Sequence, residues 1–461
     1  MQDHTREARR ALGRKAREAC SRMAQAQWDP KLRQSNPIEI LNASEEERLA
    51  DLLPEKHKRM MASPFSYYRG AAPVMAADLS RLPHTGLLTQ ICGDAHVYNL
   101  GSLTALDGHI IFDINDFDET IPGPWEWDVE RMATSLVLVG RESGSRDVAC
   151  QEAVLHFVRY YREAMRNFSE MPVVDLARYR VLRHPERTAI APVLQRAQLS
   201  TNQQAFQKMA KRKDGRFELK EKRVSSDVAK KVRQAIHDYS LSLLPERRHF
   251  FNQYQVEDVG FRVVGCGSVG MRDYVALMLG AAEDDPLLLQ VKEEAHSCYS
   301  SYLPDARVPE NQGQRAAEGQ RAMQFQSDIL LGWTRLDGRD YLVRQLRDHK
   351  ASIENKELKG NGLRQYAEVC AQLLAKGHAR AGDPSALWGY MGASTKFDKA
   401  IAKFAMVYAD QTTKDYELYK SLFTKSGHPK KSAKTGAGKK IKAKAAPEPK
   451  AMAAAAKGTA N

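Results

Sequence analysis

The sequence predicts an α+β fold in which a larger helix-rich lobe is joined to a small lobe built on an antiparallel sheet. Amphipathic helical patterns occupy residues 127–141 and 148–168, and they return from Leu363 onward. Between residues 258 and 346, short apolar runs alternate with turn residues, as is typical of antiparallel strands. A polar and basic stretch at 200–232 separates these apolar blocks, so we place a lobe boundary there.

The charge of the chain is concentrated in its last segment. The 461 residues carry a formal net charge of +13, and 43% of them are hydrophobic. Residues 425–461 contain ten lysines and one acidic residue, a net charge of +9. The rest of the chain is therefore nearly balanced, unlike a dedicated nucleic-acid-binding domain. We expect the tail to be disordered and to make at most a weak contact with nucleic acid or an anionic surface.

Several protein classes are excluded by the composition. No apolar run approaches the roughly 18–20 residues that cross a bilayer, and the charged N-terminus does not resemble a signal peptide. The six cysteines are scattered without a CxxC pair, which argues against a structural zinc site. We therefore expect a cytoplasmic protein with reduced thiols and no membrane span.

The chain divides into five segments. We predict a charged helical extension at 1–43, the first part of the helical lobe at 44–232, a β-rich nucleotide-binding lobe at 233–350, C-terminal helices completing the helical lobe at 351–424, and the disordered tail at 425–461.

In the first half of the chain, helices are expected at 1–35, 44–62 and 63–82. The pattern Ser44-x-x-Glu47 predicts a capping box at the start of the second of these helices. Strands are expected at 87–92 and 108–116, because both runs are short and apolar.

In the second half, strands are expected within 258–279 and at 286–292, followed by a helix at 309–326. Residues 328–333 and 340–346 predict a hairpin closed over residues 336–338. Helices follow from Leu363 onward.

Acidic residues cluster between residues 94 and 119. Asp94, Asp113, Asp116, Asp118 and Glu119 lie at strand ends and in loops rather than on a regular polar face. Such carboxylates repel one another unless a cation is bound, and Mg²⁺ is the cation that prefers oxygen ligands shared with phosphates. The alternative is a set of loop acids paired with arginines.

A glycine-rich run and a lysine follow much later in the chain. Gly265, Gly267 and Gly270 form a G-x-G-x-x-G pattern, with Ser268 inside it, between two β-type segments. A dinucleotide fold would instead place a helix after the glycines, so strand–glycine–strand favours a loop over ATP phosphates. A simple hairpin turn is the alternative. Lys292 ends the next apolar strand and needs a carboxylate partner, for which Glu318 or Glu310 is the candidate.

Residues 92–128 resemble the catalytic segment of kinase-like phosphotransferases of the aminoglycoside and choline kinase branch. That branch has an HGDxHxxN loop, and here Cys92 replaces its first His while Gly93, Asp94, His96 and Asn99 match. The resemblance implies that Asp94 receives the proton of the attacking hydroxyl, that Asn99 and Asp113 hold Mg²⁺, and that Asp116 is a second metal ligand. Trp127-Asp128 resembles the Asp-bearing helix start that braces this loop. His96 has the alternative reading of a loop histidine bonded to a backbone carbonyl.

The order of these motifs is that of a circularly permuted kinase. Asp94 precedes the glycine loop and Lys292, whereas an ordinary kinase has the reverse order. Permutation predicts that the end of the chain supplies the helix that runs into the catalytic loop, and residues 363–378, with the trailing His378, have that pattern. The alternative is coincidence between two weak motifs.

The chain also resembles a large bacterial family of unknown function over residues 45–420. The shared motifs are Ser63-Pro64-Phe65 with Arg69-Gly70, and the runs 92–100, 112–120, 122–128, 267–270, 290–293, 319–324, 344–348 and 378–383. Leu100 and Ala381 depart from the family pattern, which has Phe and Ser at those places.

Three functions follow from these motifs. The first is an ATP- and Mg²⁺-dependent phosphotransferase acting on a small hydroxyl or amino acceptor, since no activation-loop-like segment lies between Asp113 and Trp127. The second is a non-catalytic nucleotide-binding protein with a basic tail. The third, a metal-dependent phosphohydrolase built on Gly93-Asp94-x-His96, lacks the further motifs that it requires.

Overall fold

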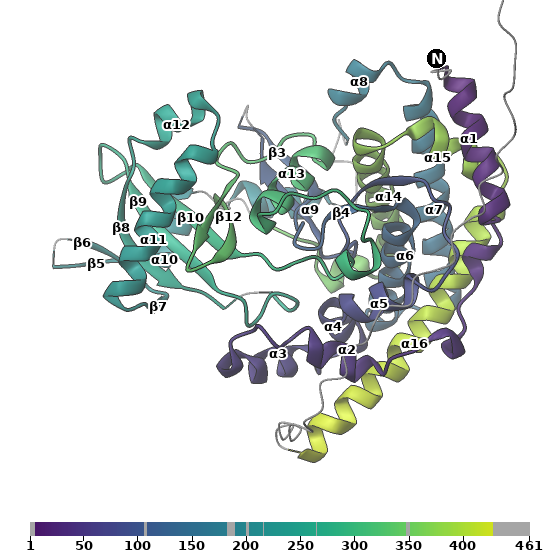
Figure 1. Cartoon of the computed structure of the whole chain (residues 1–461), viewed down its shortest axis with the longest axis horizontal. Coiled ribbons are helices and arrows are strands. Elements are labelled where there is room, and N and C mark those ends of the chain that lie inside the picture. Colours follow the sequence, from purple (N-terminus) through teal and green to yellow (C-terminus); the bar gives the residue numbers. More distant parts are fainter. Residues whose placement is uncertain are drawn as a thin grey trace, which may run out of the picture.

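The protein has a helix-rich mixed α/β fold with antiparallel sheets (Figure 1). The computed structural model describes residues 5–105, 108–181, 190–199, 202–214, 216–263, 265–346 and 351–426. A six-stranded sheet lies at one end of the molecule, and the long helices lie at the other end. The expected combination of helices and an antiparallel sheet is thus confirmed. The tail from residue 427 onward, which we expect to be disordered, is outside the described residues.

The six-stranded sheet has the order β11-β12-β10-β9-β8-β7, and every neighbouring pair is antiparallel. Its strands are β7 (Lys222–Arg223), β8 (Gln255–Phe261), β9 (Asp273–Leu279), β10 (Pro286–Glu293), β11 (Gly332–Leu336) and β12 (Arg339–Gln345). The two central strands are buried along almost their whole length, which explains their nearly continuous apolar sequences. Since β7 pairs with β8, the sheet begins before residue 233, where the sequence placed the β-rich segment.

Helices cover both faces of the sheet. The helices around it are α10 (Asn202–Met209), α11 (Ser226–Tyr239), α12 (Pro245–Phe251) and α13 (Gln312–Met323). Val275 and Leu288 belong to the hydrophobic cluster that contains residues of α10. Ala276 and Leu289 belong to the cluster that contains residues of α11. Adjacent strand residues thus serve opposite faces. The predicted hairpin is present, with Asp337 and Gly338 in its turn, although β11 begins later than residue 328.

The N-terminal helices differ from their predicted bounds. They are α1 (Arg6–Ala19), α2 (Pro37–Ala43), α3 (Leu53–Met60), α4 (Pro64–Gly70) and α5 (Ala72–Leu79). The capping-box prediction at Ser44 is wrong, because Ser44 follows the end of α2 and its hydroxyl donates to the Leu41 carbonyl. The predicted helix at 63–82 is divided at Ala71, just before Pro73 in the first turn of α5.

The main core lies between the long helices at the other end of the molecule. These helices are α6 (Trp125–Glu142), α7 (Asp147–Glu170), α8 (Val173–Ala177), α9 (Ala191–Gln198), α14 (Gly362–Ala381), α15 (Pro384–Met391) and α16 (Lys396–Ser426). α14 packs along α7, and α16 packs on both α6 and α7. The helices predicted from Leu363 onward, and those predicted at 127–141 and 148–168, are therefore confirmed.

Shorter elements complete the structure. Short two-stranded sheets pair β1 (Leu88–Ile91) with β4 (Ile121–Pro124), β2 (Leu100–Thr104) with β3 (Ile110–Ile114), and β5 (Ala210–Lys213) with β6 (Arg216–Leu219). Single 3₁₀ turns occur at Ala24–Ala26, Pro30–Leu32, Ala50–Leu52, Ser240–Ser242, Ser300–Tyr302 and Asn355–Leu358. Among the described helices, none is long and apolar enough to span a membrane.

Candidate functional site

The loop that follows β1 is fixed by the first turn of α6. The Asp128 carboxylate accepts hydrogen bonds from the backbone N–H groups of Cys92 (2.8 Å) and Gly93 (2.9 Å). Gly93 has a positive φ of 78°, and a Cβ there would lie 2.2 Å from the Glu119 carbonyl oxygen. Only glycine fits at this point. The brace predicted at Asp128 is present, and it sets the path of the chain into Asp94.

Asp94 is held by a fully buried arginine of α6. Arg131 Nε donates to Asp94 Oδ1 over 2.7 Å, and the Asn99 side-chain amide donates to the Asp94 carbonyl over 2.6 Å. Burial raises the pKa of Asp94 above its ordinary value, and Arg131 only partly opposes this effect. The carboxylate is therefore fixed in position and is a stronger base than an exposed aspartate.

His96 is a buried and neutral member of the same loop. Burial, together with the charge of Arg69, lowers the pKa of His96 well below its ordinary value. The Tyr98 N–H donates to His96 Nδ1 over 3.2 Å, so the ring proton is on Nε2, which lies 3.6 Å from Asp94 Oδ2. The predicted bond to a backbone carbonyl is replaced by a bond from a backbone N–H.

The glycine loop lies between β8 and β9 and is held by Arg48, Leu49 and Arg59 of the N-terminal segment. Arg48 donates to the carbonyls of Gly267 and Val269, both over 2.6 Å, and Arg59 donates to that of Gly265 over 2.6 Å. The Leu49 N–H donates to the Gly270 carbonyl over 2.8 Å. The carbonyl oxygens of the loop thus point to residues 48–59.

Lys292 pairs with the acidic segment and not with α13. Its Nζ bonds both carboxylate oxygens of Asp118, and it lies 3.9 Å from Asp116 Oδ1 and 4.0 Å from Glu294 Oε1. The prediction of Glu318 as its partner is wrong, because Glu318 is exposed on α13 and accepts a bond from Gln314. The partner of Lys292 is Asp118, a member of the acidic cluster that the sequence analysis did not select as a site residue.

The Asp113 side chain points away from the other predicted metal ligands. It lies within β3, and its carboxylate accepts bonds from Lys376 Nζ of α14 (2.5 Å) and from the Phe325 N–H (3.2 Å). It does not line the pocket that contains Asn99 and Asp116. The assignment of Asp113 to a metal is therefore corrected to a buried ion pair with Lys376.

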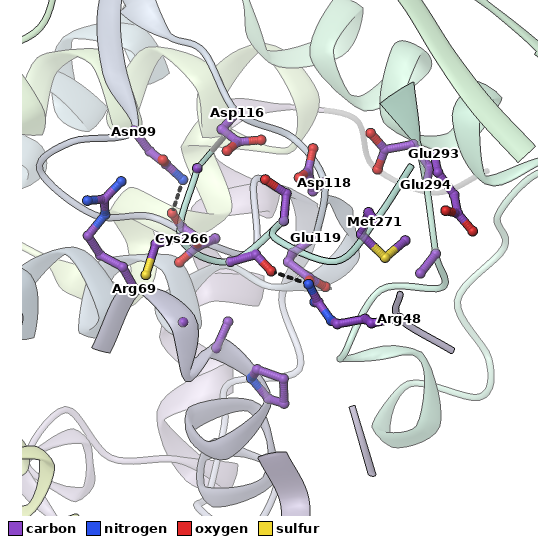
Figure 2. A pocket seen from close by; sticks show the side chains of 18 of the residues that line it. Arg48, Arg69, Asn99, Asp116, Asp118, Glu119, Cys266, Met271, Glu293 and Glu294 are labelled. Atoms are coloured by element: carbon purple, nitrogen blue, oxygen red, sulfur yellow. Dashed lines mark hydrogen bonds between the residues drawn. The ribbon is translucent and has the colours of Figure 1, made fainter. Parts of the chain in front are cut away.

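Four stretches of the chain line one pocket, which we call the central pocket (Figure 2). Its volume is about 110 Å³, and its lining comes from residues 48–73, 94–119, 265–271 and 293–296. Of the predicted site residues, it brings together Asp94, Asn99, Asp116, Gly265, Gly267 and Ser268. Lys292 and Gly270 line a smaller adjoining cavity that shares Ser268 and Met271 with the pocket.

The central pocket is rich in carboxylates. Burial opposes the ionisation of Asp116, but Lys292, the hydrogen bond with Asp118 and Arg344 together outweigh this effect and lower the pKa of Asp116. Asp116 Oδ1 and Glu294 Oε1 are buried and accept no hydrogen bond from the described residues. Such oxygens suit Mg²⁺, although no three His, Cys, Asp or Glu side chains of the described chain are grouped closely enough to hold a metal alone. A phosphate group would have to supply the remaining ligands.

The lining residues that sequence reasoning missed include Arg48, Arg69 and Glu294. Arg69 belongs to a motif shared with the bacterial family. The sequence therefore marked this residue but assigned it no role. Arg48 and Glu294 have no local signal, since only the fold brings residues 48 and 294 to the same pocket.

Comparisons with known proteins identify a family for the chain. No curated protein and no solved structure matches the chain. Residues 48–422 match one family, described as an uncharacterized protein conserved in bacteria. Since the match covers most of the chain and includes every residue of the central pocket, the protein belongs to this bacterial family, DUF2252.

Proposed function

We propose that this protein is an ATP- and Mg²⁺-dependent phosphotransferase whose acceptor is a small molecule with a hydroxyl or amino group. The observation that carries the proposal is the composition of the central pocket. Asp94, Asn99 and Asp116 share it with the glycine loop, although more than a hundred residues separate them in sequence. The Lys292 ammonium, bonded to Asp118, adjoins the same pocket.

Each group then has a chemical task. The acceptor hydroxyl oxygen forms a bond to the γ-phosphorus, the bond to the ADP oxygen breaks, and the hydroxyl proton passes to Asp94. The glycine loop N–H groups and Lys292 bind the phosphates. Asp116, together with the phosphates, would hold Mg²⁺, which would supply positive charge to the transferring group. The products are ADP and the phosphorylated acceptor.

We further propose a circularly permuted kinase-like arrangement. The end of α14 supports it, because His378 Nε2 lies 3.2 Å from Asp128 Oδ2 and the Thr89 hydroxyl donates to the His378 carbonyl over 3.2 Å. α14 therefore ends beside β1, immediately before the Asp94 loop, as a permuted chain requires.

Nucleotide binding requires the pocket to open. Its volume of about 110 Å³ is well below the roughly 300–1,000 Å³ of typical small-molecule sites. The glycine loop lines the pocket, and Arg48 and Arg59 hold it through hydrogen bonds to its carbonyls. We expect these bonds to break and the loop to move outward when ATP binds.

A second candidate is nucleotide binding without transfer. The Arg131–Asp94 pair favours it, because the guanidinium bonds the carboxylate that would accept the proton and partly opposes the rise in its pKa. The two candidates share ATP binding and differ only in turnover.

Calorimetric titration with ATP and Mg²⁺, followed by an assay of slow ATP hydrolysis, separates these functions. We expect Lys292→Met to weaken ATP binding at least tenfold, and the exposed Lys356→Met to leave it unchanged. Asp94→Asn should keep ATP binding and reduce hydrolysis by about 100-fold or more. Binding without any hydrolysis by the unaltered protein would favour the second candidate. Absence of ATP binding would contradict both.

A further inference from the structure

Arg69 is a pocket arginine whose position is set by an aromatic ring. It lies in the last turn of α4 and lines the central pocket together with Asp94, His96 and Asn99. Its Cζ lies 5.4 Å from the centre of the Tyr98 ring, and Phe65 packs edge-on against that ring with centroids 5.2 Å apart. Stacking therefore fixes the guanidinium without using its N–H groups.

The guanidinium of Arg69 has no acceptor among the described residues. Its Nε is buried without a hydrogen-bond partner, and no carboxylate lies within ion-pair distance of it in the described chain. Other arginines of the site differ, since Arg131 bonds Asp94 and Arg48 bonds loop carbonyls. A buried and unsatisfied N–H destabilises the protein, and an anionic ligand would satisfy it.

Three carboxylates that line the pocket already have donors of their own. Asp94 bonds Arg131, Asp118 bonds Lys292, and Glu293 bonds Arg272 and Arg339. In Figure 2, Arg69 and Asn99 are on one side of the pocket, and Glu293 and Glu294 are on the opposite side. Arg69 therefore lies on the Asn99 side of the pocket, opposite Glu293 and Glu294, and no described carboxylate forms an ion pair with it.

We propose that Arg69 binds an anionic group, a carboxylate or a phosphate, carried by the acceptor substrate. The planar guanidinium matches the two oxygens of such a group, and the stacked position presents its N–H edge. An acceptor held in this way places its hydroxyl on the adjacent Asp94. The assignment to the acceptor rests on the proposed phosphotransferase function, and it excludes polycationic acceptors, which Arg69 would repel.

Inorganic phosphate is the probe for this site. Calorimetric titration of the full chain with phosphate, with and without saturating ADP and Mg²⁺, should show binding in both conditions. Arg69→Gln should weaken phosphate binding at least tenfold and leave ADP binding unchanged. The phosphate affinity of Arg69→Lys should lie between those of Arg69→Gln and the unaltered protein. Lysine keeps the positive charge but lacks the paired N–H donors of the planar guanidinium. The exposed Arg81→Gln is the control and should bind phosphate as the unaltered protein does.

Two results would overturn the inference. Equal phosphate affinity in Arg69→Gln and the unaltered protein would show that Arg69 binds no anion. Displacement of phosphate by ADP would assign Arg69 to the nucleotide phosphates instead of the acceptor. Failure of ADP itself to bind would count against the proposed function, whereas the titration without ADP tests the anion site alone. Melting curves without ligand establish that each variant is folded.

Discussion

At the scale of single residues, the site depends on where each carboxylate points. Asp94 and Asp116 line the central pocket, whereas Asp113 is directed into the core and bonds Lys376. Both members of that ion pair are almost completely buried, with side-chain exposures of 2% and 1%. Removal of one partner would leave an uncompensated charge in a low-dielectric interior.

Lys376→Met tests this structural role of Asp113. We expect it to lower the free energy of unfolding by about 3–5 kcal/mol, because Asp113 would remain buried and unpaired. The double variant Lys376→Met with Asp113→Asn should recover most of this loss, since the amide oxygen still accepts the Phe325 N–H. Urea denaturation measures both. A double variant no more stable than the single one would contradict the buried-pair account.

The difference between Asp113 and Asp116 also shows a limit of sequence reasoning. The sequence predicted a strand at 108–116 that contains Asp113, and in the structure Asp113 lies inside β3, one residue before its end at Ile114. Side chains alternate between the two faces of a strand, and the sequence does not show which face of a short strand meets the pocket. The presence of the strand was predictable, but the direction of one carboxylate was not.

At the scale of secondary-structure elements, α6 connects the site to the core. Its first turn supplies Asp128 to the loop after β1, its second turn supplies Arg131 to Asp94, and Glu126 accepts bonds from the Thr85 N–H (2.5 Å) and hydroxyl (3.1 Å). Burial raises the pKa of Glu126 from 4.5 to about 7. The folded protein therefore keeps a proton that the unfolded chain releases at lower pH.

The stability of the fold should consequently depend on pH through Glu126. Its contribution is fully present below pH 4.5, is lost as the pH rises from 4.5 to about 7, and is constant above that. The Gln side chain of Glu126→Gln stays neutral at every pH. As the pH rises from 4.5 to about 7, the unfolding free energy of this variant should therefore rise by about 3 kcal/mol relative to that of the unaltered protein. Denaturation at pH 5 and pH 8 measures the change, with the exposed Glu152→Gln of α7 as control. A pH-independent difference would contradict the assignment.

Helices and strands were predicted well where the apolar periodicity is strong. They were predicted poorly where a turn or a helix cap sets the bounds. The long helices α6, α7 and α14 and the strands around the glycine loop follow directly from apolar spacing. The capping pattern at Ser44 failed because Asn36 and Pro37 start α2 earlier, so that Ser44 follows the end of that helix. β2 was missed because Leu100–Thr104 is short and contains a glycine.

At the scale of the whole molecule, the fold brings together segments far apart in the sequence. Asp118 meets Lys292 across 174 positions, and Arg48 meets Gly267 across 219. Such pairs have no local sequence signature, which explains why Glu318, a residue near Lys292 in the chain, was chosen as its partner. Motif spacing predicted the two halves of the pocket, and only the tertiary structure supplied the residues that join them.

Hydrogen–deuterium exchange of the full chain, with and without ATP and Mg²⁺, tests the central claim most directly. If both halves of the central pocket bind one nucleotide, then amides of residues 92–99 and 265–271 should gain protection together, and Lys292→Met should abolish both changes. Protection in neither segment, or in only one of them, would contradict a single phosphate-binding site between the two.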